Sequence, residues 1–218
     1  MSKKLAIIVG VGPGLGFALA RTFADAGHPV AILGRNEARL NEFAKNLADA
    51  PAPVRAYVAD ASDGNDLRAA IAAAIDELEA PEVLVYNAAV LQLSSPIDGD
   101  DAVWMQSFAV NILGAKIAAE TVLPALDGTG SLLFTGGGLA DTPHPSYASL
   151  AVGKAGLRNY VQSLAASLED TNVHATSVTI NGGIDGGEER FSSASLAKDY
   201  LDLHHQARAD WSPELRRD

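Results

Sequence analysis

A continuous apolar run near the start of the chain leads directly into a cluster of glycines, LAIIVGVGPGLG, residues Leu5–Gly16. An uninterrupted apolar run such as Leu5–Val9 is typical of a strand that is buried on both faces of a parallel sheet. The glycines mark a turn, and Phe17–Ala26 then has the pattern of a helix that ends at Gly27. A buried strand, a glycine turn and a helix in this order predict the first βα unit of an α/β protein.

The same alternation of short apolar runs and longer helical patterns continues along the chain, as expected of consecutive βαβ units. Further strands are predicted at Val30–Leu33, Val54–Val58, Val83–Tyr86, Ser131–Phe134 and Val173–Ile180. Helices are predicted at Asn36–Ala50, Asp66–Leu78, Asp101–Val122, Tyr147–Leu168 and Ser195–His204, and the rest after Asn181 is predicted as loops and a polar tail. We therefore expect a single domain over residues 1–218, with a doubly wound, Rossmann-type parallel sheet of about six to seven strands flanked by helices.

Composition and charge exclude several classes of function. The net charge of −11 disfavours binding to nucleic acid or to anionic membrane surfaces. The chain has no cysteine, which excludes disulfides, thiolate catalysis and cysteine metal sites. The first apolar run meets Gly10 too soon for a secretory signal, and no stretch is expected to reach the roughly 18 to 20 apolar residues of a membrane span. We expect a cytoplasmic protein without nucleic-acid or membrane partners.

The glycine turn has the chemistry of a phosphate cradle. Glycines allow a tight turn and let backbone N–H groups approach a pyrophosphate at the positive end of the following helix. Because the turn joins a strand to a helix, it predicts a dinucleotide site; the alternative is a purely structural βα turn. The predicted cradle consists of Gly10, Gly12, Pro13, Gly14, Leu15 and Gly16.

The end of the second predicted strand bears on the choice of cofactor. It reads Leu33-Gly34-Arg35-Asn36, with no carboxylate before Glu37. NAD sites usually place an acidic residue here to bind the ribose 2′-hydroxyl, whereas an arginine can pair with a 2′-phosphate. Arg35 therefore favours NADP(H) over NAD, the alternative being that Arg35 only balances Glu37.

From about Lys4 to Ile184 the chain resembles the short-chain dehydrogenase/reductase family. The motifs that carry the resemblance occur in the family's order as Gly10/Gly14/Gly16, Asp60-Ala61, Tyr86-Asn87-Ala88-Ala89, Asn111-Ile112-Leu113-Gly114, Lys154-Ala155-Gly156-Leu157 and Asn181-Gly182-Gly183-Ile184. Tyr86 and Ala89 depart from the family's N-N-A-G. Beyond the glycine turn and Arg35, the resemblance implies cofactor contacts from Asp60, Ala61, Asn87, Ala88, Ala89, Lys154, Gly182 and Ile184.

The resemblance fails at the active site. The family uses a Ser–Tyr–Lys–Asn set, in which Tyr donates a proton to the carbonyl oxygen and Lys lowers the pKa of that Tyr. Asn111 and Lys154 match, but Leu150 stands four residues before the lysine, where the family has Tyr. Glycines follow Thr135 where the family has Ser. The nearest hydroxyls are those of Thr135 and of Tyr147, which precedes Lys154 by nearly two helical turns.

Three interpretations of Tyr147 stay open: a displaced catalytic acid, a substrate contact, or a partly buried tyrosine with a satisfied hydroxyl. His144, on the proline-rich loop, is a candidate for a substitute acid. Asp141 and Asp185 are candidates for the pocket border, and Lys154 has the alternative of a surface lysine. The histidines His144, His174, His204 and His205 show no metal-like spacing beyond the adjacent pair, so no metal is expected.

Two functions fit these residues. The first is an NADP(H)-dependent oxidoreductase acting on a small carbonyl or alcohol, with Lys154, Asn111, Tyr147 and Thr135 in catalysis. The second is a catalytically inactive dinucleotide-binding protein that serves as a sensor or partner subunit. In the resembling family the two long helices pair subunits, which implies a homodimer or homotetramer.

Overall fold

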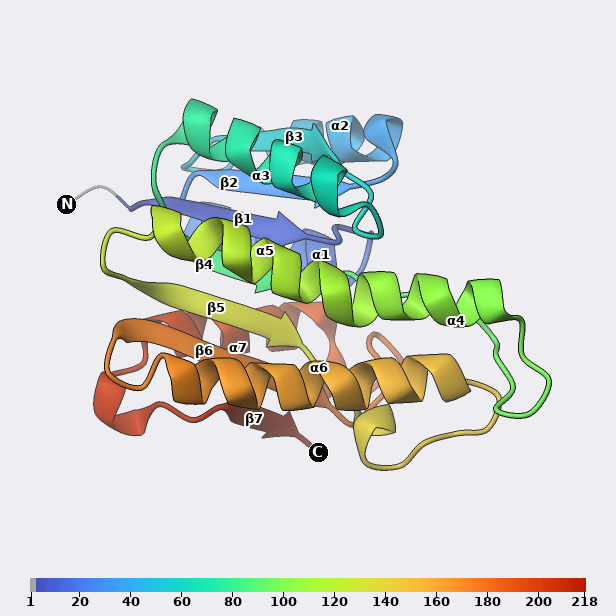
Figure 1. Cartoon of the computed structure of the whole chain (residues 1–218). Coiled ribbons are helices and arrows are strands. Elements are labelled where there is room, and N and C mark those ends of the chain that lie inside the picture. The colour runs from blue at the N-terminus through green and yellow to red at the C-terminus, as the bar shows by residue number, and fades with distance from the viewer. Residues whose placement is uncertain (1–2) are drawn as a thin grey trace.

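The computed structural model describes residues 3–218, in which seven parallel strands form one sheet with helices on both faces (Figure 1). The strand order across the sheet is β3-β2-β1-β4-β5-β6-β7. The strands are β1 Leu5–Val9, β2 Val30–Gly34, β3 Val54–Val58, β4 Pro81–Tyr86, β5 Thr129–Thr135, β6 Asn172–Ile180 and β7 Glu214–Arg217. The predicted doubly wound fold is thus confirmed, and the strand order reverses between β1 and β4, the point where such sheets bind ligands.

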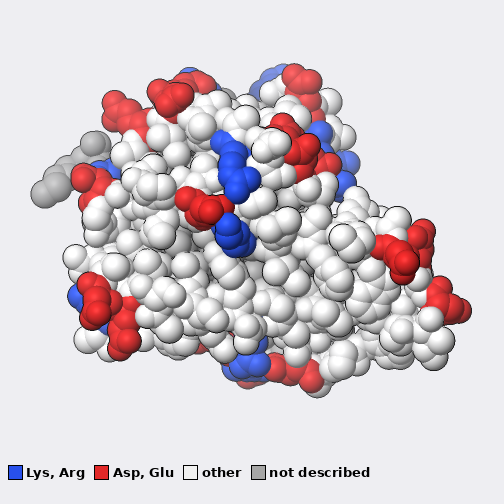
Figure 2. Space-filling view, viewed as in Figure 1, with Lys and Arg blue, Asp and Glu red and all other residues white. Residues whose placement is uncertain are grey.

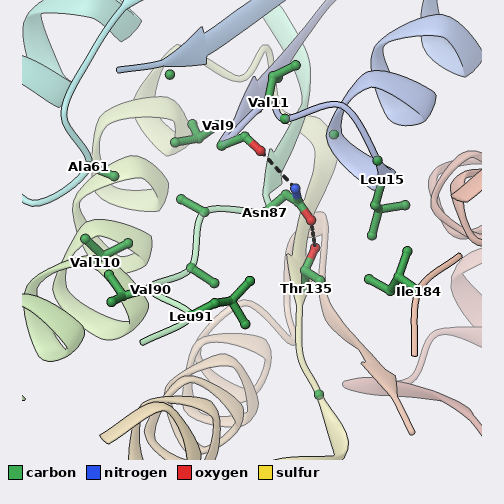
Figure 3. Close-up of a pocket in the computed structure, with 18 of the residues that line it drawn as sticks. Val9, Val11, Leu15, Ala61, Asn87, Val90, Leu91, Val110, Thr135 and Ile184 are labelled. Carbon is green, nitrogen blue, oxygen red and sulfur yellow. Dashed lines mark hydrogen bonds between the residues drawn. The ribbon is translucent and has the colours of Figure 1, made fainter. Parts of the chain in front are cut away.

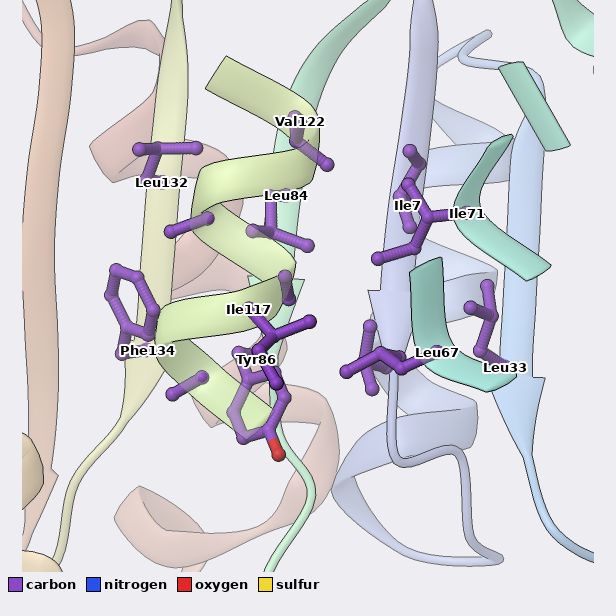
Figure 4. Close-up of a cluster of buried hydrophobic side chains, with 14 of the residues drawn as sticks. Ile7, Leu33, Leu67, Ile71, Leu84, Tyr86, Ile117, Val122, Leu132 and Phe134 are labelled. Carbon is purple, nitrogen blue, oxygen red and sulfur yellow. The ribbon is translucent and has the colours of Figure 1, made fainter. Parts of the chain in front are cut away.

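Two helical layers cover the sheet. One layer is α1 Leu15–Asp25, α2 Glu37–Asn46 and α7 Ser193–His205, and the other is α3 Gly64–Leu78, α5 Ala115–Val122 and α6 Ala148–Ser167. Successive side chains of a strand point to opposite faces, so Ile7 packs into the α3–α5–α6 layer and Ile8 into the α1–α2–α7 layer. Figure 4 shows the first of these cores, where Leu84 and Phe134 of the sheet lie against Ile117 of α5.

The predicted long helix from Asp101 contains a change of helix type. It runs as α4 Asp101–Phe108, a π-helical segment Ala109–Gly114 and then α5. Widened π-helical turns inside α-helices are frequent at functional sites, and this one contains Asn111. The tyrosine that departs from the family's motif, Tyr86, donates a hydrogen bond to the carbonyl oxygen of Val110 at 2.6 Å and so ties the segment to β4.

The apolar composition of this helix has a structural cause. By length and composition alone, Asp101–Ala125 could cross a membrane, because its mean hydropathy reaches 1.3 over the best window. The apolar character has its explanation in the core: Ala115, Ala118 and Val122 are completely buried against the sheet. Small apolar side chains let the helix pack closely on the strands, and the same side chains raise its mean hydropathy.

The polar tail was also predicted wrongly, because Glu214–Arg217 forms the edge strand β7 beside β6. The strand has mostly charged residues and therefore lacks the apolar run by which the other strands were predicted. Charged residues are typical of exposed edge strands. The tail is held by ion pairs, Arg217 to Asp199 at 2.6 Å and Arg216 to Asp141 at 2.6 Å.

Candidate active site

A cavity of about 780 Å³ opens at the carboxyl ends of the central strands (Figure 3). Its volume is in the range of cofactor sites. Of the residues predicted to contact a cofactor, those that line it are Gly10, Gly12, Gly14, Leu15, Gly16, Arg35, Asp60, Ala61, Asn87, Ala88, Ala89, Lys154, Gly182 and Ile184. Pro13 is not among the lining residues. The topology therefore gathers at one place residues that lie far apart in the sequence.

Two glycines of the turn are needed because the chain packs closely against them, and a third borders open space. Gly10 has φ +88°, and a Cβ there would collide with the backbone of Ala88. A Cβ on Gly16 would come within 2.8 Å of the Cα of Val11. A Cβ on Gly12 would meet nothing within 4 Å in the part of the chain that is described, and no side chain of that part caps the N-terminus of α1. Uncapped N–H groups at the start of a helix bind anions, so the turn fits a pyrophosphate.

Two arginines stand at one end of the cavity. Arg35 follows β2, and Arg39 lies in the first turn of α2, whose N-cap Asn36 accepts a hydrogen bond from the Arg39 N–H at 2.9 Å. Arg39 was not predicted from the sequence, although its position four residues after Arg35 was the available signal. Burial opposes ionisation of Asp60, but hydrogen bonds from Ser62 and the charge of Arg35 outweigh it and hold the pKa of Asp60 below its usual range. This end therefore carries two guanidinium groups and one carboxylate.

A chain of hydrogen bonds crosses the floor of the cavity. Asn87 donates from Nδ2 to the carbonyl oxygen of Gly10 at 2.9 Å, which orients the amide, and its Oδ1 accepts from the Thr135 hydroxyl at 2.9 Å (Figure 3). The Tyr200 hydroxyl lies 2.7 Å from the same Thr135 oxygen. Since a hydroxyl has one proton and that of Thr135 is given to Asn87, Tyr200 is the donor of the last bond. The Thr135 proton is therefore already engaged within the protein.

Lys154 reaches the cavity from α6 and is 8% exposed. Its Nζ donates to the main-chain oxygen of Thr135 at 2.7 Å. Burial lowers the pKa of Lys154 to about 8, because the charged form loses its hydration. The lysine is thus a buried cavity residue rather than a surface residue, and its ammonium group can release a proton near neutral pH.

Leu150 and Gly137, the positions at which the sequence predicts a departure from the family's Tyr and Ser, both border the cavity. Leu150, one turn before Lys154, is 3% exposed and lines the cavity with its apolar side chain. Gly137, at the position expected for Ser, has extended backbone that any residue adopts. A Cβ on Gly137 would lie 3.8 Å from the Lys154 side chain, an ordinary contact distance. The backbone at Gly137 therefore has room for a side chain.

The other catalytic candidates lie outside the cavity lining. Asn111 is buried, accepts from the Val90 N–H at 3.0 Å and donates to the Ser107 hydroxyl at 2.8 Å, so it holds the loop after β4. Tyr147 is the N-cap of α6, is 37% exposed and has its ring beside His144. Neither Tyr147 nor His144 is among the residues that line the cavity.

The two acidic candidates have different surroundings. Asp141 pairs with Arg158 and Arg216 and does not line the cavity. Asp185 does line it, beside Gly14, and accepts hydrogen bonds from the Ser193 hydroxyl at 2.6 Å and N–H at 2.7 Å. These bonds hold the pKa of Asp185 below its usual value, so this carboxylate is a fixed acceptor rather than a proton donor.

Comparison with known proteins identifies the class. The family model for short chain dehydrogenases matches residues 4–187, and the chain belongs to this family of NAD(P)-dependent oxidoreductases. Sulfoacetaldehyde reductase 2 of Chromohalobacter salexigens is 31% identical over 180 residues, 81% of this chain and 71% of the relative.

Solved structures share the fold. A metagenomic short-chain oxidoreductase in complex with NADP superposes with a TM-score of 0.89 at 22% identity, over 100% of this chain and 99% of that one. An NADPH-bound short chain oxidoreductase from Pseudomonas aeruginosa PAO1, described as containing an atypical catalytic center, has a TM-score of 0.89 at 21% identity, over 99% and 95% of the two chains. At these identities the likeness concerns the fold.

Proposed function

We propose that the protein is an NADP(H)-dependent oxidoreductase that acts on a small carbonyl or alcohol. The observation that carries the proposal is one continuous cavity that has two arginines at one end and a buried lysine at the other. The glycine turn and the N-terminus of α1 lie between them, as a dinucleotide requires. The NADP complex of a structural neighbour supports the choice of cofactor.

In this proposal Arg35 and Arg39 bind the 2′-phosphate, and the backbone around Gly12 and Gly14 binds the pyrophosphate. The bound nicotinamide supplies or accepts the hydride. Asn87, held by Gly10 and Thr135, supports the wall beside the nicotinamide end. Leu91 and Leu150 line this end with apolar side chains, and the buried Leu150 limits the access of water.

We assign the proton transfer to Lys154. During reduction of a carbonyl, hydride goes to the carbon and the Lys154 ammonium gives a proton to the oxygen; oxidation of an alcohol reverses both transfers. Of the hydroxyl candidates, Thr135 has its proton engaged by Asn87, and Tyr147 is not part of the cavity lining. Asn111 acts indirectly, by positioning the loop at Val90.

A cofactor-binding protein without turnover is the competing function. It is favoured by Leu150, because no tyrosine hydroxyl stands one turn before Lys154. The two functions separate when the protein is mixed with NADPH and a panel of small aldehydes and ketones while the absorbance of the reduced cofactor is followed. Oxidation of NADPH that is lost in Lys154→Met supports the enzyme, whereas saturable NADPH binding without oxidation by any carbonyl supports the sensor or partner subunit.

We further propose a cytoplasmic homodimer or homotetramer that pairs through α4–α5 and α6. Figure 2 shows a broad area without charged side chains over α6. Exposed apolar side chains on the helices of this face are Met105, Leu113 and Val152. An apolar face of this kind favours association over exposure to water. Light scattering of the purified protein tests this, and a monomer at micromolar concentration contradicts it.

A further inference from the structure

Three histidines converge at the amino ends of the strands, whereas the cofactor cavity lies at the carboxyl ends. His28 precedes β2, and His204 and His205 end α7. One ring nitrogen of each lies within 4.8 Å of those of the other two. His28 was not predicted as a partner of the adjacent pair His204 and His205, because it comes from a distant part of the chain.

Within the described residues, one ring nitrogen of His28 has no hydrogen-bond partner. The residue is completely buried, and its Nδ1 lies 3.0 Å both from the carbonyl oxygen of Lys4 and from Oε1 of Glu82. Two acceptors around Nδ1 place the ring proton there, so the neutral ring has a free lone pair on Nε2. Within residues 3–218, that Nε2 is buried without a hydrogen-bond partner. Such an orphaned polar atom is costly unless something binds it.

The other two rings complete the arrangement. Nδ1 of His204 lies 3.0 Å from the Ser131 hydroxyl, which leaves its Nε2 available, and its ring centroid is 5.4 Å from that of His28. His205 is exposed, and its Nε2 accepts a hydrogen bond from the Lys3 ammonium group at 3.0 Å.

We propose that His28, His204 and His205 bind a Zn²⁺ ion, with water in the fourth position. Neutral imidazoles are preferred zinc ligands, and zinc-binding histidines commonly hold their second nitrogen in a hydrogen bond to a carboxylate or carbonyl. Glu82 and Lys4 give His28 this support, and Ser131 gives it to His204. The ion displaces Lys3, whose ammonium group occupies the exposed side. It ties the end of α7 to the loop that precedes β2.

The test uses the full chain without an affinity tag, after treatment with a chelator. Calorimetry with Zn²⁺ is expected to give one equivalent, and Co²⁺ is expected to give the intense visible bands of a four-coordinate site. His205→Ala, at an exposed position, is expected to weaken Zn²⁺ at least about tenfold. The matched control is His144→Ala, an exposed histidine outside the cluster, and it should bind as the unchanged protein does.

Two further variants sharpen the result. Lys3→Met removes the competing cation and is expected to tighten Zn²⁺ binding, which a merely structural effect would not do. His204→Gln is expected to abolish the cobalt bands even if His28→Gln fails to fold. No stoichiometric binding, or equal affinities for His205→Ala and His144→Ala, would overturn the proposal. NADPH binding is measured in parallel and is expected to be the same in His205→Ala, because the two sites lie at opposite edges of the sheet.

Discussion

The ammonium group of Lys154 lies 2.7 Å from the main-chain oxygen of Thr135, while the side chain of Thr135 faces Asn87 and Tyr200. One residue at the end of β5 thus holds the lysine through its backbone and the cavity floor through its hydroxyl. The Lys154 ammonium group can therefore transfer a proton, whereas the proton of the Thr135 hydroxyl is engaged by Asn87. This division of roles underlies the predictions on catalysis.

Replacing Lys154 by methionine should abolish NADPH oxidation and stabilise the fold. A buried ammonium group with a pKa near 8 instead of 10.5 is less stable in the folded than in the unfolded chain. Below pH 8 its removal should raise the free energy of unfolding by about 1–3 kcal/mol, as urea titration measures. An unchanged or lower unfolding free energy would contradict the burial of a charge at this position.

The lowered pKa of Lys154 makes both the stability and the activity of the protein depend on pH. The folded pKa lies below the unfolded one, so between pH 8 and 10.5 the unfolded chain binds more protons. The contribution of Lys154 to stability therefore improves as pH rises through this window. Carbonyl reduction, which needs the ammonium form, should fall above about pH 8, and alcohol oxidation should rise there. A reduction rate that stays constant up to pH 10 would rule out Lys154 as the proton donor.

Thr135→Val and Tyr147→Phe should both retain turnover within a few-fold. The valine leaves Oδ1 of Asn87 and the Tyr200 hydroxyl without their partner, which should cost about 1–3 kcal/mol of stability. Tyr147→Phe is the matched control at a position outside the cavity lining. If either variant loses turnover while still binding NADPH, its hydroxyl, rather than Lys154, supplies the proton.

Gly137→Ser combined with Leu150→Tyr should rebuild the set of residues that the family uses. The backbone at Gly137 accepts a side chain, and Leu150 is one turn from Lys154. We expect carbonyl reduction to increase by at least about tenfold, because positioned acid groups commonly contribute 10² or more. Ala73→Tyr, at an exposed position of α3 away from the cavity, is the control and should have no effect. A double variant that folds and binds NADPH without any gain would contradict this account of the cavity.

Arg35→Asp and Arg39→Asp should each weaken NADPH by about 10- to 100-fold, the range of a charge-assisted hydrogen bond. NADH lacks the 2′-phosphate and should bind with nearly unchanged affinity. Arg190→Asp serves as the control, because Arg190 is exposed and does not line the cavity. Equal losses for NADPH and NADH would contradict a phosphate contact.

Local patterns predicted most of the fold. Leu5–Val9 was predicted to the residue, since a strand buried on both faces is a continuous apolar run. The bounds of the edge strand Val54–Val58 were also predicted correctly, although it contains Arg55 and is only partly buried. The strand Glu214–Arg217 was missed because an edge strand needs no such run. Of the cavity, the glycine turn and Arg35 could be predicted because their chemistry lies within one βα unit. The Tyr200–Thr135 contact and the three histidines could not, because tertiary packing alone brings them together.

The most direct test of the central claim is calorimetric titration of the unmodified protein with NADPH and, separately, with NADH. We expect one site per chain, filled by NADPH at least about tenfold more tightly than by NADH, as a charge-assisted contact predicts. Absence of saturable binding by both dinucleotides would contradict the assignment of the cavity.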